Sequence, residues 1–274
     1  MPSTAIHGCD PAPARKVRAW RRPRGAKRRA RAAAQATILF ANVTALSEEA
    51  LSWFLAARSR AALAAWMAVE THKRGPVFDG MLQRIRQAGW VSHWAPPAQS
   101  ALSAQGANGG CLACVSSDNV HAPLSDATWK DMKGHRRAWR TDRGQITGFS
   151  LELQGTSVLV FCSYHRGGPD ADVGEALAYW TDNGRRSFLM LGDLNASADE
   201  VACLPWVQAL GASVVVPPEP TCWATPNGTT IDLVICSSAL VPLIEIECVH
   251  DVPWSPHSGL LVRLARNTSA FQMP

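Results

Sequence analysis

The sequence predicts an α/β fold. Two short apolar runs, residues 37–41 and 65–69, have the length and composition of buried strands, and a helical pattern lies between them. A strand, a helix and a second strand in this order are typical of an α/β unit. The chain has 274 residues, of which 47% are apolar, so it has room for one sizeable core.

The N-terminal region differs in charge from the rest of the chain. Residues 1–33 contain ten Lys or Arg and one Asp, a net charge of +9, and the remaining 17 basic and 21 acidic residues give −4. Residues 1–35 lack apolar periodicity, and we predict a disordered tail. The basic run 15–31 suits nucleic-acid binding, a nuclear address or a transit peptide, and it equally suits a leader without a specific role.

The composition also argues against membrane and secreted classes. No apolar segment is long enough to cross a bilayer, and the start has no secretory apolar region. We therefore expect an intracellular protein with no membrane partner and with its eight cysteines reduced. Cys111 and Cys114 form a CxxC without the further ligands of a structural zinc site, so we predict two buried thiols on opposite faces of a strand.

Apolar runs and turn residues place the remaining elements. The predicted strands are residues 37–41, 65–69, 111–115, 146–153, 157–161, 188–191, 229–235 and 259–264. Ser47 is predicted to cap the first helix, and Asp199 a short later one that Pro205 limits. Between them, residues 173–180 form an amphipathic helix closed by Gly184.

Three stretches are predicted to be turns or loops. Residues 106–110 form a flexible turn, and residues 154–155 reverse the chain between two paired strands. The basic stretch 127–143 contains Trp129 and Trp139. It is predicted to be a surface loop, which is either simply solvated or in contact with a phosphate backbone.

Polar side chains lie in or directly beside the apolar runs. They are Asn42, Glu70, Tyr164, Asp193, Asn195, Asp232 and His257. Asp193 and Asn195 follow strand 188–191 at a spacing of two, so an extended chain would project both side chains from one face. The alternative is an Asx-type turn, in which the two residues cap a chain reversal.

Asp232 stands out because apolar residues surround it. An unpaired carboxylate in a buried strand is costly, so Asp232 needs a partner. His257 is the partner that we predict. A buried Asp would fix the tautomer of the His257 imidazole and raise its pKa.

Six short motifs follow one another along the chain, at residues 42–46, 68–72, 109–110 with 163–164, 192–195, 220–223 with 230–234, and 255–260. In this order they resemble the motifs of the endonuclease/exonuclease/phosphatase superfamily, the group of apurinic endonucleases, DNase I and the endonucleases of non-LTR retrotransposons. The resemblance covers residues 36–265 as one domain and leaves residues 1–35 and 266–274 as tails.

The resemblance implies a four-layer α/β sandwich of the DNase I type, with two packed mixed β-sheets flanked by helices. It also implies hydrolysis of a phosphodiester, most simply by a DNA endonuclease that uses Mg²⁺, or Mn²⁺ in its place. Glu70 would bind the metal ion with Asn42 beside it, and Asp193 would activate or orient the attacking water with help from Asn195. The phosphate would be contacted by Tyr164 and by His257, which Asp232 orients.

Two positions depart from the family pattern. Thr44 and Pro256 stand where the family usually has metal-side carboxylates, which leaves Glu70 as the main carboxylate ligand. One alternative function is therefore a catalytically impaired, retroelement-derived domain that binds nucleic acid or a protein partner. Another is a phosphomonoesterase of the same fold.

Overall fold

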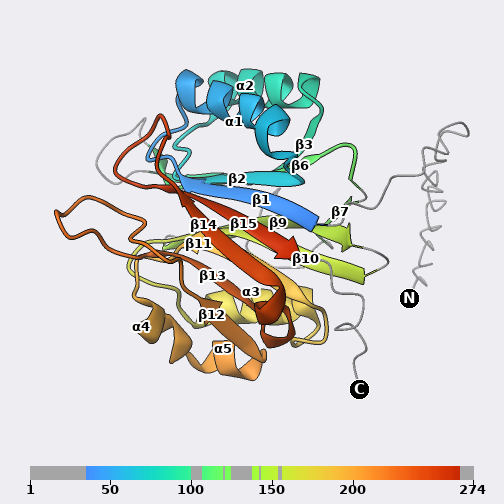
Figure 1. Cartoon of the computed structure of the whole chain (residues 1–274), viewed down its shortest axis with the longest axis vertical. Helices are drawn as coiled ribbons and strands as arrows, with labels where there is room; N and C mark the ends of the chain where they lie inside the picture. The colour runs from blue at the N-terminus through green and yellow to red at the C-terminus, as the bar shows by residue number, and fades with distance from the viewer. Residues whose placement is uncertain are drawn as a thin grey trace, which may run out of the picture. The chain divides into compact units, whose positions relative to one another are not determined.

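The computed structural model describes residues 35–99, 107–119, 121–124, 138–141, 143–153 and 156–265. These residues form two mixed β-sheets packed against each other, with helices on the outer face of each sheet (Figure 1). The four-layer sandwich implied by the resemblance is therefore confirmed. None of the described helices has the length and apolar character to cross a membrane.

The first sheet has its strands in the order β14-β15-β1-β2-β6-β3. Their bounds are Ile244–Val249, Gly259–Ala265, Gln35–Asn42, Ala65–Val69, Cys111–Ser116 and Trp90–Ala95. β1 is parallel to β2 and antiparallel to β15. β1, the first strand of the described residues, therefore lies inside this sheet with a neighbour on each side.

The second sheet has the order β12-β13-β11-β10-β9-β7, and β8 also pairs with β9. Their bounds are Ala212–Val215, Asp232–Ser237, Phe188–Asp193, Thr156–His165, Gly144–Leu153 and His121–Pro123, with β8 at Ala138–Arg140. β10 and β11 are parallel, so both end at the same edge of the sheet. A separate short pair joins β4, Ala98–Gln99, to β5, Ala107–Asn108.

Helices cover the outer faces. α1, Glu48–Ala61, and α2, Gly75–Gln87, pack on the first sheet, while α3, α4 and α5 lie on the far side of the second (Figure 1). The latter three span Ala171–Thr181, Ala198–Ala202 and Pro205–Ala209, and a 3₁₀ helix, η1, spans Ser238–Leu243. Alternate residues of each strand separate the layers: Met67 faces the core between the sheets, and Trp66 packs under α1 and α2.

Most predicted strands lie within the observed ones. Ser47 caps α1 as predicted, its hydroxyl accepting a hydrogen bond from the Ala50 amide. Cys111 and Cys114 are buried free thiols on opposite faces of β6, also as predicted. The α3 helix contains residues 173–180, but Asp182 in the left-handed conformation ends it rather than Gly184.

Several boundaries were wrong. Residues 229–231 precede the strand, which begins at Asp232, and Ser197 caps α4 through a capping box with Glu200, so Asp199 lies inside the helix. Pro205 begins α5. Several elements were not predicted at all, among them α2, β3, β12 and β14.

Two predicted loops also differ. Residues 107–108 form β5 instead of a flexible turn, and Trp139 is buried in β8 instead of lying on a surface loop. Residues 125–137 and 154–155 lie outside the described residues. The strand pairing expected across residues 154–155 is present, since Leu153 faces Thr156 in register.

Candidate active site

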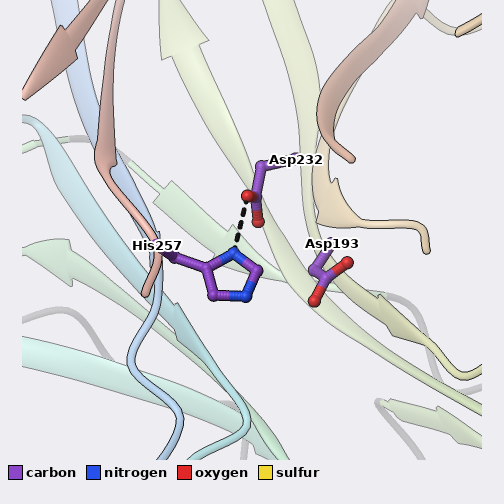
Figure 2. Close-up of side chains that lie close together, drawn as sticks. All are labelled: Asp193, Asp232 and His257. Atoms are coloured by element: carbon purple, nitrogen blue, oxygen red, sulfur yellow. Dashed lines mark hydrogen bonds and ion pairs between the residues drawn. The ribbon is translucent and has the colours of Figure 1, made fainter. Parts of the chain in front are cut away.

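Four polar side chains from different elements meet at one end of the two sheets. Asn42 ends β1, Asp193 ends β11, Asp232 begins β13, and His257 lies just before β15. Asn42 Nδ2 donates to Asp193 Oδ2 at 2.7 Å and lies 3.3 Å from His257 Nε2. On the other side of the imidazole ring, Nδ1 lies 2.8 Å from Asp232 Oδ2, so the predicted Asp232–His257 pair is present (Figure 2).

Local packing explains why the two aspartates come together. Asp193 and Asp232 are register partners on antiparallel β11 and β13. Gly192 precedes Asp193, and a Cβ there would lie 2.8 Å from the Ser163 carbonyl oxygen, so glycine permits the close approach of β10 and β11. Thr221 fixes the start of β13, because its Oγ1 accepts a hydrogen bond from the Asp232 amide at 3.1 Å.

His257 is positioned by the same segment that holds Asp232. Cys222 forms an isolated antiparallel bridge with His257, and the Ser258 amide donates to the Thr221 carbonyl at 2.8 Å. Segment 221–222 thus ties the start of β13 to the loop before β15. The distance between Asp232 and His257 is set by backbone hydrogen bonds as well as by the side-chain contact.

Asp193 and Asn195 form a turn as well as part of the site. The Asn195 amide donates to Asp193 Oδ1 at 3.1 Å, which is the Asx-type turn weighed from the sequence. The φ of Asn195 is +46°, so the chain is not extended there, and the two side chains do not project together from one face. Asn195 Nδ2 donates instead to the His165 carbonyl at 3.0 Å, while Asp193 is almost fully buried.

The buried site holds more negative than positive charge. Burial, followed by the negative charge of Asp232, raises the pKa of Asp193 to about 7, although His257 and hydrogen bonds from Asn42 and Asn195 oppose the shift. Burial tends to lower the pKa of His257, but its hydrogen bond to Asp232 and the nearby carboxylates outweigh burial and raise it. Asp232 Oδ1 is buried without a hydrogen-bond partner among the described residues.

Glu70 and Tyr164 complete the open side of this site. Glu70 follows β2 with a φ of +53°, and its carboxylate lies 3.9 Å from His72 Nε2. Tyr164 is inside β10, not beyond it, and is buried. Burial and then Glu70, through its charge and a side-chain hydrogen bond, raise the pKa of Tyr164, as does Asp193, whereas the charge of Arg166 lowers it. The Tyr164 hydroxyl therefore stays protonated between two carboxylates.

Thr44 and Pro256, the two departures from the family pattern, lie on adjoining loops. Thr44 Oγ1 donates to the Ser255 carbonyl at 3.1 Å, so a neutral contact joins the loops. The Thr44 amide donates to Asn42 Oδ1 at 2.8 Å. Both ends of the Asn42 amide are thus engaged, and its role as a metal ligand stays a prediction.

The donor set fits a hard divalent cation. One ligand atom each from Asp193, Asp232 and His257 lies within 4.8 Å of the others. Carboxylate oxygens suit Mg²⁺, and the carboxylates of Asp193, Asp232 and Glu70 face a single imidazole. A cation would offset the negative charge of the neighbouring carboxylates of Asp193 and Asp232.

Two residues that lie beside Tyr164 and support the site were not identified from the sequence. Gln145 in β9 accepts a hydrogen bond from the Gly110 amide at 3.0 Å and is the register partner of Tyr164. Gly109 packs so close that a Cβ would lie 2.2 Å from the Gln145 oxygen. The Gly109-Gly110 pair was noted as a motif, but no pattern singled out Gln145. Arg166, whose charge acts on Tyr164, gave no signal either.

Comparison with known proteins gives one family match for this chain. A family model described as "Endonuclease/Exonuclease/phosphatase family" matches residues 77–257, a range that contains Tyr164, Asp193, Asn195, Asp232 and His257 but begins after Glu70. No protein in a curated set of sequences matches the chain.

Solved structures with the same fold include three with informative names. An AP endonuclease from Leishmania major is 11% identical, over 85% of this chain and 88% of that one, with a TM-score of 0.59. The endonuclease domain of TRAS1, a telomere-specific non-LTR retrotransposon, is 13% identical. The match covers 84% of this chain and 98% of that one, with a TM-score of 0.58. The human Nocturnin catalytic domain is 12% identical. The match covers 84% of this chain and 92% of that one, with a TM-score of 0.55. At these identities the likeness is one of fold.

Proposed function

This chain belongs to the endonuclease/exonuclease/phosphatase family, and we propose that it hydrolyses phosphodiester bonds in nucleic acid as a DNA endonuclease. The observation that carries the proposal is the buried chain of contacts from Asp193 through Asn42 and His257 to Asp232. It places an acceptor for a water proton beside a donor for a phosphate oxygen, which is what water attack on a phosphodiester needs.

In this proposal Asp193 takes the proton of the attacking water. Hydrogen bonds from Asn42 Nδ2 and the Asn195 amide hold the two oxygens of its carboxylate. A pKa of about 7 is matched to proton transfer at neutral pH. Asn195 itself acts through its backbone amide and by fixing the turn after β11.

His257 and Tyr164 are the proposed phosphate contacts. Asp232 accepts a hydrogen bond from His257 Nδ1–H. In the protonated imidazole, Nε2–H would give up the 3.3 Å contact with the Asn42 nitrogen, which is also a donor, and would point to a phosphate oxygen and stabilise the negative charge that develops there. Tyr164 keeps its proton because burial and Glu70 raise its pKa. When substrate binds, its hydroxyl would exchange the hydrogen bond to Glu70 for one to the same phosphate.

Glu70 is the proposed main ligand of the metal ion, with Asn42 as the second predicted ligand. When bound, Mg²⁺ or Mn²⁺ supplies positive charge to the phosphate oxygens and lowers the pKa of a bound water. Glu70 suits this role because its carboxylate is partly exposed while Asp232 is fully buried.

Nicking of supercoiled plasmid DNA tests this function. Asp193→Ala should lower the rate by about 100-fold or more, because it removes the acceptor for the water proton. EDTA should abolish nicking by the unaltered chain. Asp79→Ala, on the exposed side of α2, removes a carboxylate away from the site and should leave the rate unchanged. The proposal is contradicted if Asp193→Ala nicks DNA at the rate of the unaltered chain, or if EDTA does not affect nicking.

One observation favours a second candidate, a catalytically impaired domain that binds nucleic acid or a partner protein. At the two positions where family members usually carry metal-side carboxylates, this chain has Thr44, bonded to the Ser255 carbonyl, and Pro256. Fewer charged ligands should weaken metal binding. Metal-dependent nicking by the unaltered chain would exclude this candidate.

A further inference from the structure

Exposed arginines gather beside Tyr164. They come from three segments that end near the site: Arg74 four residues after Glu70, Arg140 and Arg143 around the turn between β8 and β9, and Arg166 directly after β10. We call these four residues the basic rim. They adjoin the site because β9 and β10 pair Gln145 with Tyr164 and Gly144 with His165.

Backbone contacts hold the rim together. Arg74 Nη2 donates to the Ala98 carbonyl at 3.1 Å, and Arg140 Nη1 donates to the neighbouring Pro97 carbonyl at 3.4 Å. Two guanidinium groups from distant segments therefore contact consecutive residues at the point where a loop enters β4. The same loop lies close to the site, since a Cβ on Gly110 would be 3.3 Å from the Pro97 ring.

A second set of contacts fixes the other end of the rim. Arg143 Nη2 donates to the Gly167 carbonyl at 3.2 Å, and the Arg166 amide donates to the Arg143 carbonyl at 2.6 Å. Arg166 is close enough for its charge to act on the Tyr164 hydroxyl. The rim thus runs from the loop at Pro97 to the edge of the reaction centre.

Three of the rim arginines differ in their partners from three arginines elsewhere on the surface. Arg84, Arg185 and Arg263 each form an ion pair with a carboxylate. Among the described residues, Arg140, Arg143 and Arg166 have no carboxylate within ion-pair distance. A guanidinium has five N–H donors and matches phosphate geometry, so unpaired arginines beside a phosphate-handling site suit phosphate binding.

We infer that the basic rim binds backbone phosphates next to the one that is cleaved, so that the substrate is a nucleic-acid strand and not an isolated phosphomonoester. This inference rests on the proposed function for the position of the cleaved phosphate. It assigns Arg140, Arg143 and Arg166 to the strand on the Tyr164 side of the site. Such contacts position a strand without reading its sequence.

Salt-dependent binding of a fluorescein-labelled oligonucleotide tests the rim. The triple variant R140Q/R143Q/R166Q should bind roughly tenfold or more weakly near 0.1 M salt, since affinity follows the number of phosphates neutralised. Each lost contact should reduce the slope of log affinity against log salt by about 0.7 to 0.9. All proteins keep the same basic N-terminal residues, so differences between variants report the rim.

The control removes the same charge elsewhere. R84Q/R185Q/R263Q changes three ion-paired arginines and should bind within about twofold of the unaltered chain. The triple variant R140K/R143K/R166K keeps the charge and should retain most of the salt slope, which guards against a folding defect in the Gln variant. Equal binding by the Gln variant and the unaltered chain, or an equal loss in the control, overturns the inference.

Failure of the rim and failure of the proposed function can be told apart. The unaltered chain is also assayed with bis(p-nitrophenyl) phosphate, a small phosphodiester. If the chain hydrolyses that diester but its binding of the oligonucleotide does not depend on the rim arginines, only the inference about the rim is overturned. If binding depends on the rim arginines but the chain cleaves neither DNA nor the small diester, the proposed endonuclease activity is overturned and the inference about the rim is retained.

Discussion

The relative positions of the side chains at the centre of the site depend on which groups donate and which accept hydrogen bonds. Asn42 is pivotal because its single amide nitrogen lies between Asp193 Oδ2 and His257 Nε2, while its oxygen takes the Thr44 amide. The family resemblance implied a place for Asn42 on the metal side. Its contacts in the structure fix Asp193 and His257 relative to each other, a role that spacing alone does not reveal because the two partners are 151 and 215 residues away.

The Asp232–His257 pair was predictable for a simple reason. A carboxylate inside an apolar strand needs a partner, and few histidines follow it in the chain. The orientation of Asn195 was not predictable, because it depends on a left-handed backbone and on the His165 carbonyl. Hydrogen bonds to the backbone of another strand leave no trace in residue spacing.

Thr44→Asp should make stability depend on a divalent cation. The new carboxylate would face the Ser255 carbonyl in place of a donated hydrogen bond, which should cost about 1–2 kcal/mol in EDTA. Mg²⁺ should restore the loss by binding between this carboxylate and Glu70. Thermal unfolding with and without Mg²⁺ measures the change.

The matched control for this substitution is Thr44→Asn. It loses the same hydroxyl without adding charge, and Asn tolerates the φ of +55° at this position. Its unfolding should not respond to Mg²⁺. If Thr44→Asp responds no more than Thr44→Asn, the ion does not bind beside Glu70. A gain of nicking in Thr44→Asp combined with Pro256→Asp, where the unaltered chain has none, would support the impaired-domain candidate.

Among the elements, the buried strands were predictable and α2 was not. Strands such as β2 and β11 are continuous apolar runs, which is what a strand buried on both faces requires. Gly75, Pro76 and Gly80 resemble turn signals and hide α2. Its core contacts, Phe78, Met81 and Ile85, nevertheless lie at helical spacing, and proline is well suited to the first helical turn.

Two glycines in different elements should respond in opposite directions to alanine. A Cβ on Gly148 in β9 would lie 2.2 Å from the Val160 carbonyl oxygen of β10, so Gly148→Ala should destabilise by about 1–3 kcal/mol. Gly80 lies on the exposed side of α2 with nothing within 4 Å, and Gly80→Ala should stabilise by about 0.5–1 kcal/mol. Urea unfolding measures both. Equal stability of Gly148→Ala and the unaltered chain would contradict the close packing of β9 on β10.

At the scale of the whole domain, the arrangement of the sheets could not be worked out from periodicity. β1 and β15, at opposite ends of the domain sequence, are neighbours, and β14 occupies the sheet edge. Apolar runs indicate that strands exist but not their order. The four-layer sandwich was implied by the family resemblance that the order of the motifs carries. The same resemblance assigned Asn42, Asp193, Asp232 and His257 to one catalytic site before any contact was known.

The pH dependence of stability tests how deeply two titratable side chains are buried. Burial lowers the pKa of His165 and raises the pKa of Asp193, so the two groups change the unfolding free energy in opposite directions as pH falls. Burial lowers the pKa of His165 to about 3, so between that value and about 6.5 only the unfolded chain binds the proton, and stability falls as pH falls. Asp193 acts in the opposite sense. With its pKa raised to about 7, the folded chain binds a proton that the unfolded chain does not, and stability rises as pH falls below that value.

Comparison with His165→Gln separates the two groups. Asp193 titrates in both proteins and cancels in the difference, whereas His165 contributes only to the unaltered chain. The unfolding free energy of the unaltered chain minus that of the variant should therefore fall by about 2 kcal/mol from pH 7 to pH 5. Urea unfolding in EDTA at both pH values measures it. A difference that does not change with pH would mean that His165 is protonated inside the fold, which its full burial against Ser163 argues against.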